Sequence, residues 1–372
     1  MYNAAWPLFV HIAILAGAGL LVAQTGTRMA GYAKRLASRT GLGQAMTGAL
    51  FLGASTSLSG IITSVTAAAG GHPELAASNA VGGIAAQTVF LAIADRVYSR
   101  ANLEHAAASD ENMLQGALLI ALLALSLLAA AVPEYTLFGV HPVTPLLLLA
   151  YAFGQRLVLR AQSREMWRPR ITEFTQTAEG EGSAEDGGQE SGSARESAPA
   201  GTSGESSSRA ARRRESLLTL WGKFFTTALL LGVLGYLLAS AGVVVAERTG
   251  LNETVLGGIF TAVSTSFPEL VTAIAAVRMG ALTLAVSDII GGNAFDMIFL
   301  AVADIAFRDG SLYHAMGSRP DFLILLTILL TSVLLLGLIR REKHGIANIG
   351  FESVLMVLIY AGGFALIVTV MG

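Results

Sequence analysis

Residues 249–304 read TGLNETVLGGIFTAVSTSFPELVTAIAAVRMGALTLAVSDIIGGNAFDMIFLAVAD, and residues 40–95 read TGLGQAMTGALFLGASTSLSGIITSVTAAAGGHPELAASNAVGGIAAQTVFLAIAD. The two stretches align without a gap at a constant offset of 209 residues, and 22 of the 56 aligned pairs are identical. Apolar composition alone produces some matches, but it does not keep Ser, Thr, Gly and Asp in register. A duplicated apolar segment with a Gly- and Ser-rich interruption indicates a transporter built from two structural repeats.

The composition is typical of a membrane protein. Hydrophobic residues make up 53% of the chain and charged residues only 13%, whereas a soluble domain carries about 25% charged residues. A run of about 20 apolar residues is long enough to cross a bilayer as a helix. The sequence therefore predicts an all-α membrane protein with ten transmembrane helices, near residues 5–24, 43–69, 75–95, 113–132, 143–160, 217–243, 251–277, 281–306, 320–339 and 351–370.

Charge and cysteine content exclude other kinds of protein. A net charge of −2 does not suit a nucleic acid or another polyanion as a partner. The chain has no cysteine, which excludes disulfides and thiolate metal sites. The first apolar run lacks the basic n-region of a signal peptide, and four basic residues follow it instead. We therefore predict a first helix that stays in the membrane.

The distribution of Lys and Arg predicts the orientation in a cell membrane. Cytoplasmic loops are enriched in these residues. With the N-terminus outside, the segments on the inside carry 20 of the 24 Lys and Arg residues, and the outside segments carry only Arg248, Arg308 and Arg319. We expect both termini outside and the central loop in the cytoplasm.

The ten runs divide into two halves of five. Residues 1–160 form the first five-helix repeat and residues 217–372 form the second. Between them, residues 161–216 are rich in Gly, Ser and Glu and poor in aliphatic residues, so we predict a disordered cytoplasmic linker. Because five is odd, the second half enters the bilayer from the opposite side, and the two repeats have inverted topology.

Polar motifs interrupt the apolar helices of the second repeat. Ser264-Thr265-Ser266-Phe267-Pro268-Glu269 combines hydroxyls with a proline that breaks the helix and a carboxyl group at mid-membrane. Gly291-Gly292-Asn293-Ala294-Phe295-Asp296 adds a second acid. Carboxylate, carbonyl and hydroxyl oxygens are the ligands that hard cations such as Ca²⁺ prefer. The alternatives are back-bonding of the hydroxyls to their own helix and simple packing for the glycines.

Three further acids allow either a structural or a functional interpretation. Asp95 and Asp304 occupy equivalent positions near helix ends, and Asp95 precedes Arg96. Asp288 lies eight residues before Asp296. For these residues, interfacial or structural roles are as well supported as a role in transport.

These motifs resemble the second alpha-repeat of the cation/calcium exchanger superfamily, which includes the sodium/calcium exchangers. The family pattern is a Gly-Thr-Ser-x-Pro-Glu segment followed by Gly-Asn…Gly-Ser-Asn-x-x-Asn/Asp. The resemblance implies ten helices, two inverted repeats and a central cytoplasmic loop. It also implies a cation site, whose ligands here are Glu269, Asp296, Thr265, Ser266, the Ala262 carbonyl, Thr56, Ser57 and Gln87.

The first repeat departs from the family pattern. Ser59-Gly60 stands opposite Pro268-Glu269, so one of the two central carboxylates is missing, and Gln87 stands opposite Asp296. Glu74 belongs to the turn between the second and third predicted helices and does not easily replace the missing acid. Glu269 and Asp296 together carry −2 when ionised, which neutralises one Ca²⁺ or two Na⁺. The loss of one ligand lowers affinity for Ca²⁺ or favours a monovalent ion or proton.

Two classes of function follow from these residues. The leading hypothesis is a secondary active antiporter that exchanges Ca²⁺ or a related cation for Na⁺ or H⁺, with no cofactor beyond the transported ions. A monovalent cation/proton antiporter is a variant of it. The alternative, motivated by Gly60, is a transport-inactive sensor or scaffold. We expect no enzyme, because the sequence offers no Ser/His/Asp arrangement or phosphate loop, and its composition identifies no protein partner.

Overall fold

The structure is a computed structural model that is helical throughout most of its described length. Within the described residues, the only β-type pairing is an isolated bridge between Leu137 and Val140. The proposed linker lies outside them, except for its two end residues. The structure describes residues 5–41, 46–98, 102–107, 109–161, 216–248, 261–340 and 350–370.

The helices of the two halves follow the same order. The first half contains α1 (Leu8–Thr40), the π-helix η1 (Thr47–Gly53), α3 (Ala54–Thr56), α4 (Leu58–Ala69), α5 (Pro73–Val97), α6 (Leu103–Ala106), α7 (Asp110–Ala131) and α8 (Val143–Ala161). The second half contains α11 (Leu217–Arg248), α13 (Ala262–Thr265), α14 (Phe267–Arg278), α15 (Leu282–Ala306), α16 (Leu312–Ala315), α17 (Ser318–Arg340) and α18 (Phe351–Val370).

The repeat extends beyond the duplicated segment. Helices α11, α14, α15, α16, α17 and α18 each begin 208 or 209 residues after α1, α4, α5, α6, α7 and α8, respectively. The offset seen in the sequence over 56 residues therefore applies to nearly the whole chain. The described helices follow this two-repeat plan, and the predicted fold class, with its two inverted repeats, is confirmed.

Each predicted membrane span falls on a helix or on a bent helix pair. Seven of the described helices are long and apolar enough to cross a membrane, and the bent pair 47–56 and 58–69 makes an eighth candidate. Helix α8 and the α13–α14 pair correspond to the remaining two predicted spans, although residues 249–260 lie outside the described part. The first span was predicted too short, because α1 continues to Thr40.

Local signals in the sequence set several helix ends. Gly41 follows α1 with φ of 71°, a left-handed conformation that glycine adopts without strain. Pro73 begins α5, where its missing N–H leaves no hydrogen bond unmade. The Ser109 hydroxyl caps α7 by accepting a hydrogen bond from the Asn112 N–H at 3.2 Å.

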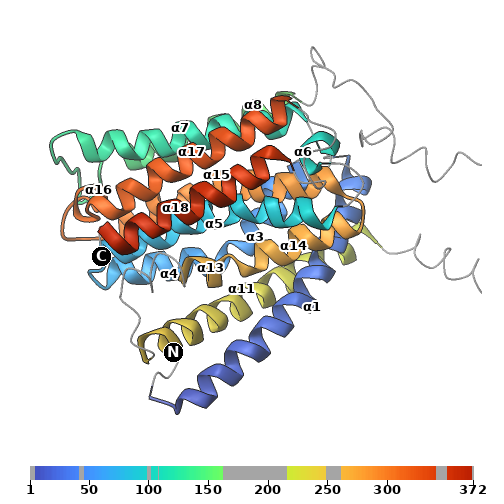
Figure 1. The fold of residues 1–372 in the computed structure, drawn as a ribbon, viewed down its shortest axis with the longest axis horizontal. Coiled ribbons are helices and arrows are strands. Elements are labelled where there is room, and N and C mark those ends of the chain that lie inside the picture. Colours follow the sequence, from blue (N-terminus) through green and yellow to red (C-terminus); the bar gives the residue numbers. More distant parts are fainter. Residues whose placement is uncertain are drawn as a thin grey trace, which may run out of the picture.

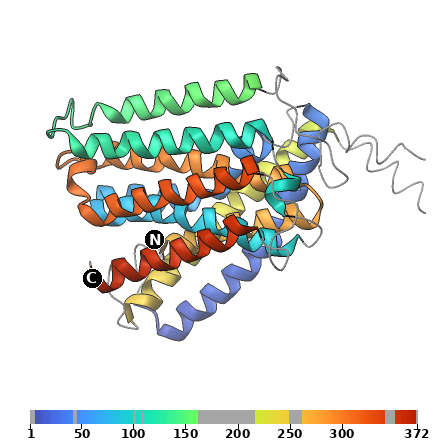
Figure 2. The same cartoon turned by 45° about the horizontal axis from the view of Figure 1, so that its top comes forward.

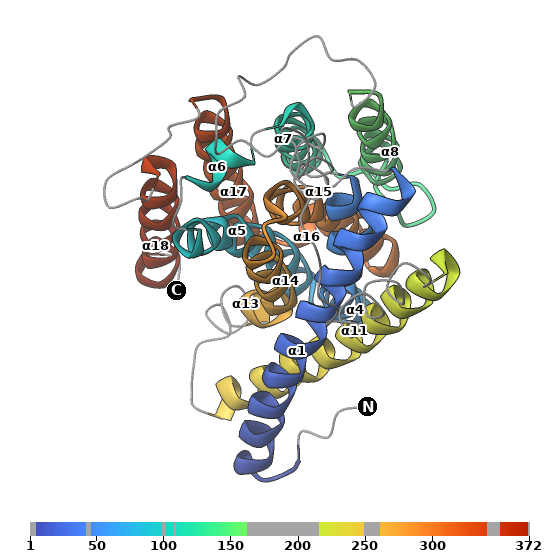
Figure 3. The same ribbon diagram turned by 90° about the vertical axis from the view of Figure 1, so that its right-hand side faces the viewer.

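Helices α5 and α15 form the centre of the molecule. In their most apolar windows 89% and 72% of the residues are buried, against 22% for α1. Figure 1 shows α1 (blue) and α11 (yellow) side by side along one edge. Figure 2 shows α7 and α8 side by side along the opposite edge. Viewed from the side in Figure 3, α15 lies among α5, α7, α14 and α16.

Both halves kink at the same aligned position. Ser57 separates α3 from α4, and its counterpart Ser266 separates α13 from α14, with ψ of −3° and 2°. Pro268 in the first turn of α14 accounts for the kink in the second half, as predicted. The first half has Ser59 in place of proline, yet it bends by 51°. There the π-helix η1 precedes the kink, and Thr261 before α13 is also π-helical.

The glycines between the halves serve close packing. A Cβ atom at Gly53 would lie 2.7 Å from the Cα atom of Gly292, and one at Gly291 would overlap Ala49. Small residues let helix backbones approach closely in membranes. The packing interpretation of Gly291 and Gly292 therefore agrees with the structure, and η1 lies directly against α15.

Asp95 fixes the end of α5 through three hydrogen bonds. Its carboxylate accepts from the Leu103 N–H at 2.7 Å, the Gly350 N–H at 3.2 Å and the Ser353 hydroxyl at 3.1 Å. Leu103 begins α6 of the same half, whereas Gly350 and Ser353 belong to the start of α18 in the other half. The fully buried Asp95 side chain therefore joins the two repeats.

Asp304 makes the same arrangement at the end of α15. It accepts from the Leu312 N–H at 2.9 Å, the His141 N–H at 2.9 Å and the Thr144 hydroxyl at 2.6 Å. Each donor lies 209 residues from its counterpart around Asp95. Of the two interpretations left open for these acids, the structural one matches their contacts. We call the two arrangements the Asp95 clamp and the Asp304 clamp.

Candidate functional site

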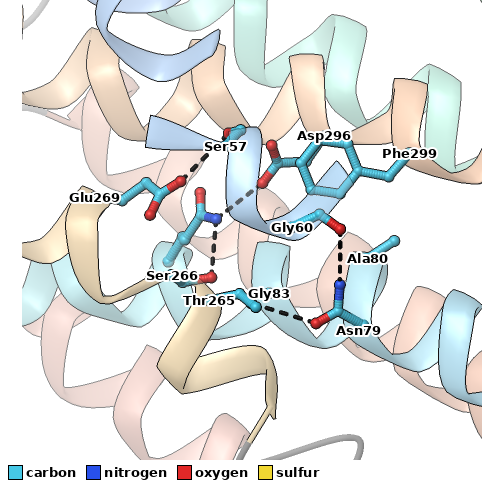
Figure 4. A pocket seen from close by; sticks show the side chains of 11 residues that line it. Ser57, Gly60, Asn79, Ala80, Gly83, Thr265, Ser266, Glu269, Asp296 and Phe299 are labelled. Carbon is cyan, nitrogen blue, oxygen red and sulfur yellow. Dashed lines mark hydrogen bonds between the residues drawn. The ribbon is translucent and has the colours of Figure 1, made fainter. Parts of the chain in front are cut away.

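A cavity lies at the centre of the molecule, where the kinks of the two halves meet α5 and α15. About 190 Å³ of space lies between the atoms that line it, a volume that includes space open to the surroundings. Figure 4 shows how its side chains converge from both repeats. The lining residues are Ser57, Gly60, Asn79, Ala80, Gly83, Gln87, Thr265, Ser266, Glu269, Asp296 and Phe299.

Glu269 projects into the cavity from the first turn of α14. Only 1% of the residue is exposed. The Ser57 hydroxyl of the other half donates a hydrogen bond to Glu269 Oε1 at 3.3 Å, and Oε2 has no hydrogen-bond partner. The kink after Ser266 places this carboxyl group at the start of a helix, where the N–H groups of the first turn favour negative charge.

Asp296 and Gln87 meet across the boundary between the repeats. They occupy aligned positions on α15 and α5, and Gln87 Nε2 donates to Asp296 Oδ2 at 2.8 Å. The same amide donates to the Ser266 hydroxyl at 3.0 Å. Asp296 Oδ1 and Gln87 Oε1 are buried without a hydrogen-bond partner. Each of these two residues therefore keeps one oxygen that could coordinate a cation.

The candidate hydroxyl ligands divide into two groups. Ser57 and Ser266 line the cavity, and their hydroxyls bond across the repeat boundary. Thr265 also lines the cavity, but its hydroxyl lies 3.0 Å from the Thr261 carbonyl and 3.1 Å from the Ala262 carbonyl of its own helix. It also lies 3.3 Å from Asn79 Oδ1 of the other half, so its single hydrogen has possible acceptors both on its own helix and across the repeat boundary.

Two of the predicted ligands do not reach the cavity surface. Thr56 is fully buried, and its hydroxyl donates to the Gly53 carbonyl at 2.8 Å. The Ala262 carbonyl accepts hydrogen bonds from the Thr265 hydroxyl and the Ser266 N–H, both at 3.1 Å. Neither residue is among those that line the cavity. Six of the eight predicted residues therefore line the cavity, and Thr56 and Ala262 do not.

The ring of Phe299 occupies the space beside Gly60, where the first repeat lacks its carboxylate. A Cβ atom at Gly60 would lie 2.5 Å from Phe299 Cε2 and 3.2 Å from Cζ. Both residues line the cavity. The Phe299 ring of α15 therefore fills the space that an acidic side chain at position 60 would need. Motif reading did not identify Phe299, because no polar pattern marks it.

Asn79 is a polar lining residue that motif reading also missed. Its Nδ2 donates to the Gly60 carbonyl at 3.2 Å, and its Oδ1 accepts from the Thr265 hydroxyl at 3.3 Å. Asn79 aligns with Asp288, and this alignment is the sequence signal that could have identified Asn79 as a candidate. Glu74, in contrast, lies outside the cavity lining and pairs with Arg319 at 3.1 Å.

The chemistry of the cavity is that of oxygen ligands. Two carboxyl groups, two serine hydroxyls and the oxygens of two side-chain amides face one another. In the described part of the chain, no three His, Cys, Asp or Glu residues form a cluster suited to a bound metal. Such a donor set suits a hard cation that binds reversibly better than a transition metal held as a structural ion.

Comparison with a family model covers most of the chain. The model of the sodium/calcium exchanger protein family matches residues 10–154 and 219–370. These ranges comprise the two helical halves and leave out the region between them.

Individual relatives match over shorter stretches. Human sodium/potassium/calcium exchanger 5 is 30% identical over 99 residues, which are 26% of this chain and 20% of the relative. The inner membrane protein YrbG of Escherichia coli (strain K12) is 33% identical over 91 residues, 24% of this chain and 28% of the relative. The putative antiporter CaxA of Alkalimonas amylolytica is 31% identical over 108 residues, 28% of this chain and 34% of the relative. The matches span about a third or less of these relatives.

Solved structures match over nearly the full length. The sodium-calcium exchanger NCX_Mj soaked with 2.5 mM Na⁺ and 0.1 mM Sr²⁺ superposes with a TM-score of 0.65 at 14% identity, covering 96% of this chain and 99% of that chain. The same exchanger soaked with 10 mM Na⁺ and zero Ca²⁺ gives a TM-score of 0.61 at 15% identity, with the same coverage. At this level of identity the likeness establishes the fold.

Proposed function

The chain belongs to the sodium/calcium exchanger protein family, and we propose that it is a secondary active antiporter that exchanges Ca²⁺ or a related cation for Na⁺ or H⁺. The observation that carries this proposal is the central cavity. Glu269 and Asp296 are buried there, and each has a carboxylate oxygen without a hydrogen-bond partner. Burying two carboxylates without a cation is costly in free energy, so a cation that binds between them is the natural counter-charge.

The proposed ligand set comes from both repeats. Glu269 and Asp296 supply the charge, and Ser57, Ser266 and Gln87 supply neutral oxygens. Thr265, Thr56 and the Ala262 carbonyl stand close behind and become ligands only if their present hydrogen bonds to the helix are released. A total charge of −2 matches one divalent or two monovalent cations, so the exchange of one for the other leaves the occupied cavity neutral.

Helices α1 and α11 are the proposed moving elements. They contact each other and lie outside the central helices. Gly26 of α1 lies against α14, and a Cβ atom there would lie 2.9 Å from Val271 Cγ1. The aligned Gly235 of α11 lies against α4, and a Cβ atom there would lie 2.8 Å from the Ser59 hydroxyl oxygen. Glycine at both crossings gives a smooth contact surface. Sliding of this pair over a neutralised site would open the cavity alternately to either side.

Cation flux in liposomes tests the proposal. Purified protein is reconstituted, and Ca²⁺ uptake is driven by an outward Na⁺ gradient. We expect uptake in the wild type and none in Glu269→Gln, because the amide keeps the shape of the side chain and removes its charge. Glu74→Gln is the matched control, since Glu74 lies outside the cavity lining. Wild-type flux in Glu269→Gln would exclude this site.

Two other outcomes distinguish the remaining alternatives. If a Na⁺ gradient drives no Ca²⁺ uptake but a pH gradient drives cation flux, the protein is a proton-coupled or monovalent-cation antiporter. If no gradient drives flux and no cation raises the melting temperature, the transport-inactive sensor or scaffold is the better description. The Gly60–Phe299 contact favours this second function, because an aromatic ring lies where the first repeat lacks its carboxylate.

We also propose that both termini lie outside the cell membrane and the central region lies in the cytoplasm. The distribution of Lys and Arg supports this orientation. Because the chain contains no cysteine, a single cysteine introduced within residues 161–216 is a clean probe. In intact cells it should resist a membrane-impermeant maleimide that labels a cysteine placed before α1. Labelling of both would contradict the orientation.

A further inference from the structure

Asp288 is a third buried acid on α15, and it does not line the cavity. The residue is 0% exposed, and its Oδ1 atom has no hydrogen-bond partner. Within the described residues, its only charged neighbours are Glu269 on α14 and Asp296 on α15, both of them acids. Because an ionised carboxylate is costly to bury without a positive partner, the function of Asp288 must include a means of neutralising it.

The aligned residue of the first repeat shows what this position does. Asn79 Nδ2 donates to the main-chain carbonyl of Gly60 at 3.2 Å and to the Ser64 hydroxyl at 2.9 Å. Gly60 is the residue aligned with Glu269. The first repeat therefore places a permanent hydrogen-bond donor against the carbonyl that follows the helix kink.

In the second repeat, Asp288 does not contact the equivalent carbonyl directly, and Thr272 lies between them. Thr272 Oγ1 lies 3.0 Å from the Glu269 main-chain oxygen and 2.6 Å from Asp288 Oδ2. The threonine hydroxyl has one hydrogen to donate, but it faces two acceptors when Asp288 is ionised. When Asp288 carries a proton, the acid donates to Thr272 and Thr272 donates to the Glu269 carbonyl. Only the protonated acid satisfies both contacts.

We propose that Asp288 is a proton-binding site coupled to the cation cavity. It holds a proton while the cavity is without a cation and releases that proton to water, becoming a carboxylate, when a cation binds. The coupling is electrostatic and reciprocal: the negative charges of Glu269 and Asp296 oppose ionisation of Asp288, and a bound cation removes this opposition. The inference rests on the proposed function, because it adds H⁺ as the coupled ion of that same antiporter.

Proton counting during cation binding tests the inference. Ca²⁺ is titrated into the purified full-length protein in two buffers that differ in ionisation enthalpy, so that calorimetry gives the number of protons released. Asp288→Asn copies Asn79 and should fit the fold. We expect it to bind Ca²⁺ and to release about one proton fewer per Ca²⁺ than the wild type, since a carboxyl group carries a single proton. An unchanged proton count would overturn the inference.

Two further variants separate a proton site from a merely structural role. Asp288→Glu keeps a titratable carboxyl group and should keep the wild-type proton count, even if its affinity for Ca²⁺ changes. Asp304→Asn removes a buried acid outside the cavity and should also leave the count unchanged. If Asp288→Asn does not fold, the Asp288→Glu comparison decides: a count that falls by one in this variant also contradicts the inference.

The same experiments separate failure of the inference from failure of the proposed function. If the wild type binds Ca²⁺ and Glu269→Gln does not, the cation site stands, and the proton count in Asp288→Asn judges Asp288 alone. If neither Ca²⁺ nor Na⁺ binds the wild type, the proposed function and the inference fail together. In vesicles, cation uptake by Asp288→Asn should depend less on pH than wild-type uptake, and an identical pH profile would again contradict the role of Asp288.

Discussion

Aligned residues of the two repeats are chemically alike at the ends of α5 and α15 but differ in charge around the cavity. At the ends, the Asp95 and Asp304 clamps use aligned donors, so the two halves are chemically alike. Around the cavity, three acids of α14 and α15, Glu269, Asp288 and Asp296, align with neutral residues of α4 and α5, Gly60, Asn79 and Gln87. The contacts that hold the helices together are therefore symmetric between the repeats, whereas the acidic side chains near the cavity belong to the second repeat.

This difference shows that the two tasks have different physical requirements. In the proposed alternating-access mechanism the two halves must have similar shapes, and the clamps hold α5 and α15 to the last helix of the opposite repeat. The proposed cation site requires only that its total charge matches that of the bound cation, whichever half supplies that charge. The absence of a carboxylate at Gly60 is therefore compatible with the helix packing, because the Phe299 ring fills the space beside Gly60.

Removing the charge of Asp296 should have the largest effect on this comparison. Asp296→Asn makes the middle of α15 resemble that of α5. We expect cation uptake in liposomes to fall about tenfold or more, since a contact to a charged group contributes about 1.5–3 kcal/mol. The double variant Asp296→Asn/Gln87→Asp moves the carboxylate to the aligned position and should recover part of the uptake. Full activity in the single variant would contradict the assigned asymmetry.

Restoring the missing acid should be the next largest effect. Gly60→Glu places a side chain where the Phe299 ring lies, and overpacking of this kind destabilises a protein by about 1–3 kcal/mol. Combining it with Phe299→Ala should relieve the clash, so the double variant should be more stable than the sum of the two single changes indicates. Melting temperatures of the four proteins give this coupling, and strict additivity would mean that Phe299 does not exclude the acid.

The two clamps should respond equally when either is weakened. We expect Asp95→Asn and Asp304→Asn each to lower stability by about 1–3 kcal/mol, because the amide is a weaker acceptor and leaves buried donors unsatisfied. Thermal unfolding of the purified variants measures this. The affinity for the transported cation should change little in both. A strong loss of affinity in only one of them would show that the clamps are not equivalent.

A small pH effect should distinguish the Asp304 clamp from the Asp95 clamp. His141, the counterpart of Gly350, is 3% exposed, and burial lowers its pKa below the usual value, although the nearby Asp304 carboxylate partly offsets this. The unfolded chain then binds more protons near pH 6, so stability should be complete above about pH 6.5 and decline as the pH falls. In His141→Gln, the melting temperature measured from pH 8 to pH 5 should lose this decline, a difference of a few degrees or less.

Much of the fold could be read from the sequence because hydrophobic length and internal repetition are strong signals. Within the described residues the predicted spans fall on helices, and Glu269 and Asp296 line one cavity as their motifs indicated. Helix ends were less accurate, since α1 extends well past the predicted end of its span. The kink at Ser57 has no proline in its first turn, so the sequence did not indicate it.

The sequence by itself determined the two-repeat plan, the membrane environment and the acids of the second half, because these depend on residue type and spacing alone. Only the tertiary structure decided which side chains face the cavity. It turned the hydroxyl of Thr56 toward its own helix, placed Phe299 beside Gly60 and linked Asp288 to Glu269 through Thr272. These contacts join residues that are distant in the chain or that carry no motif, so they depend on how the helices pack and not on local sequence.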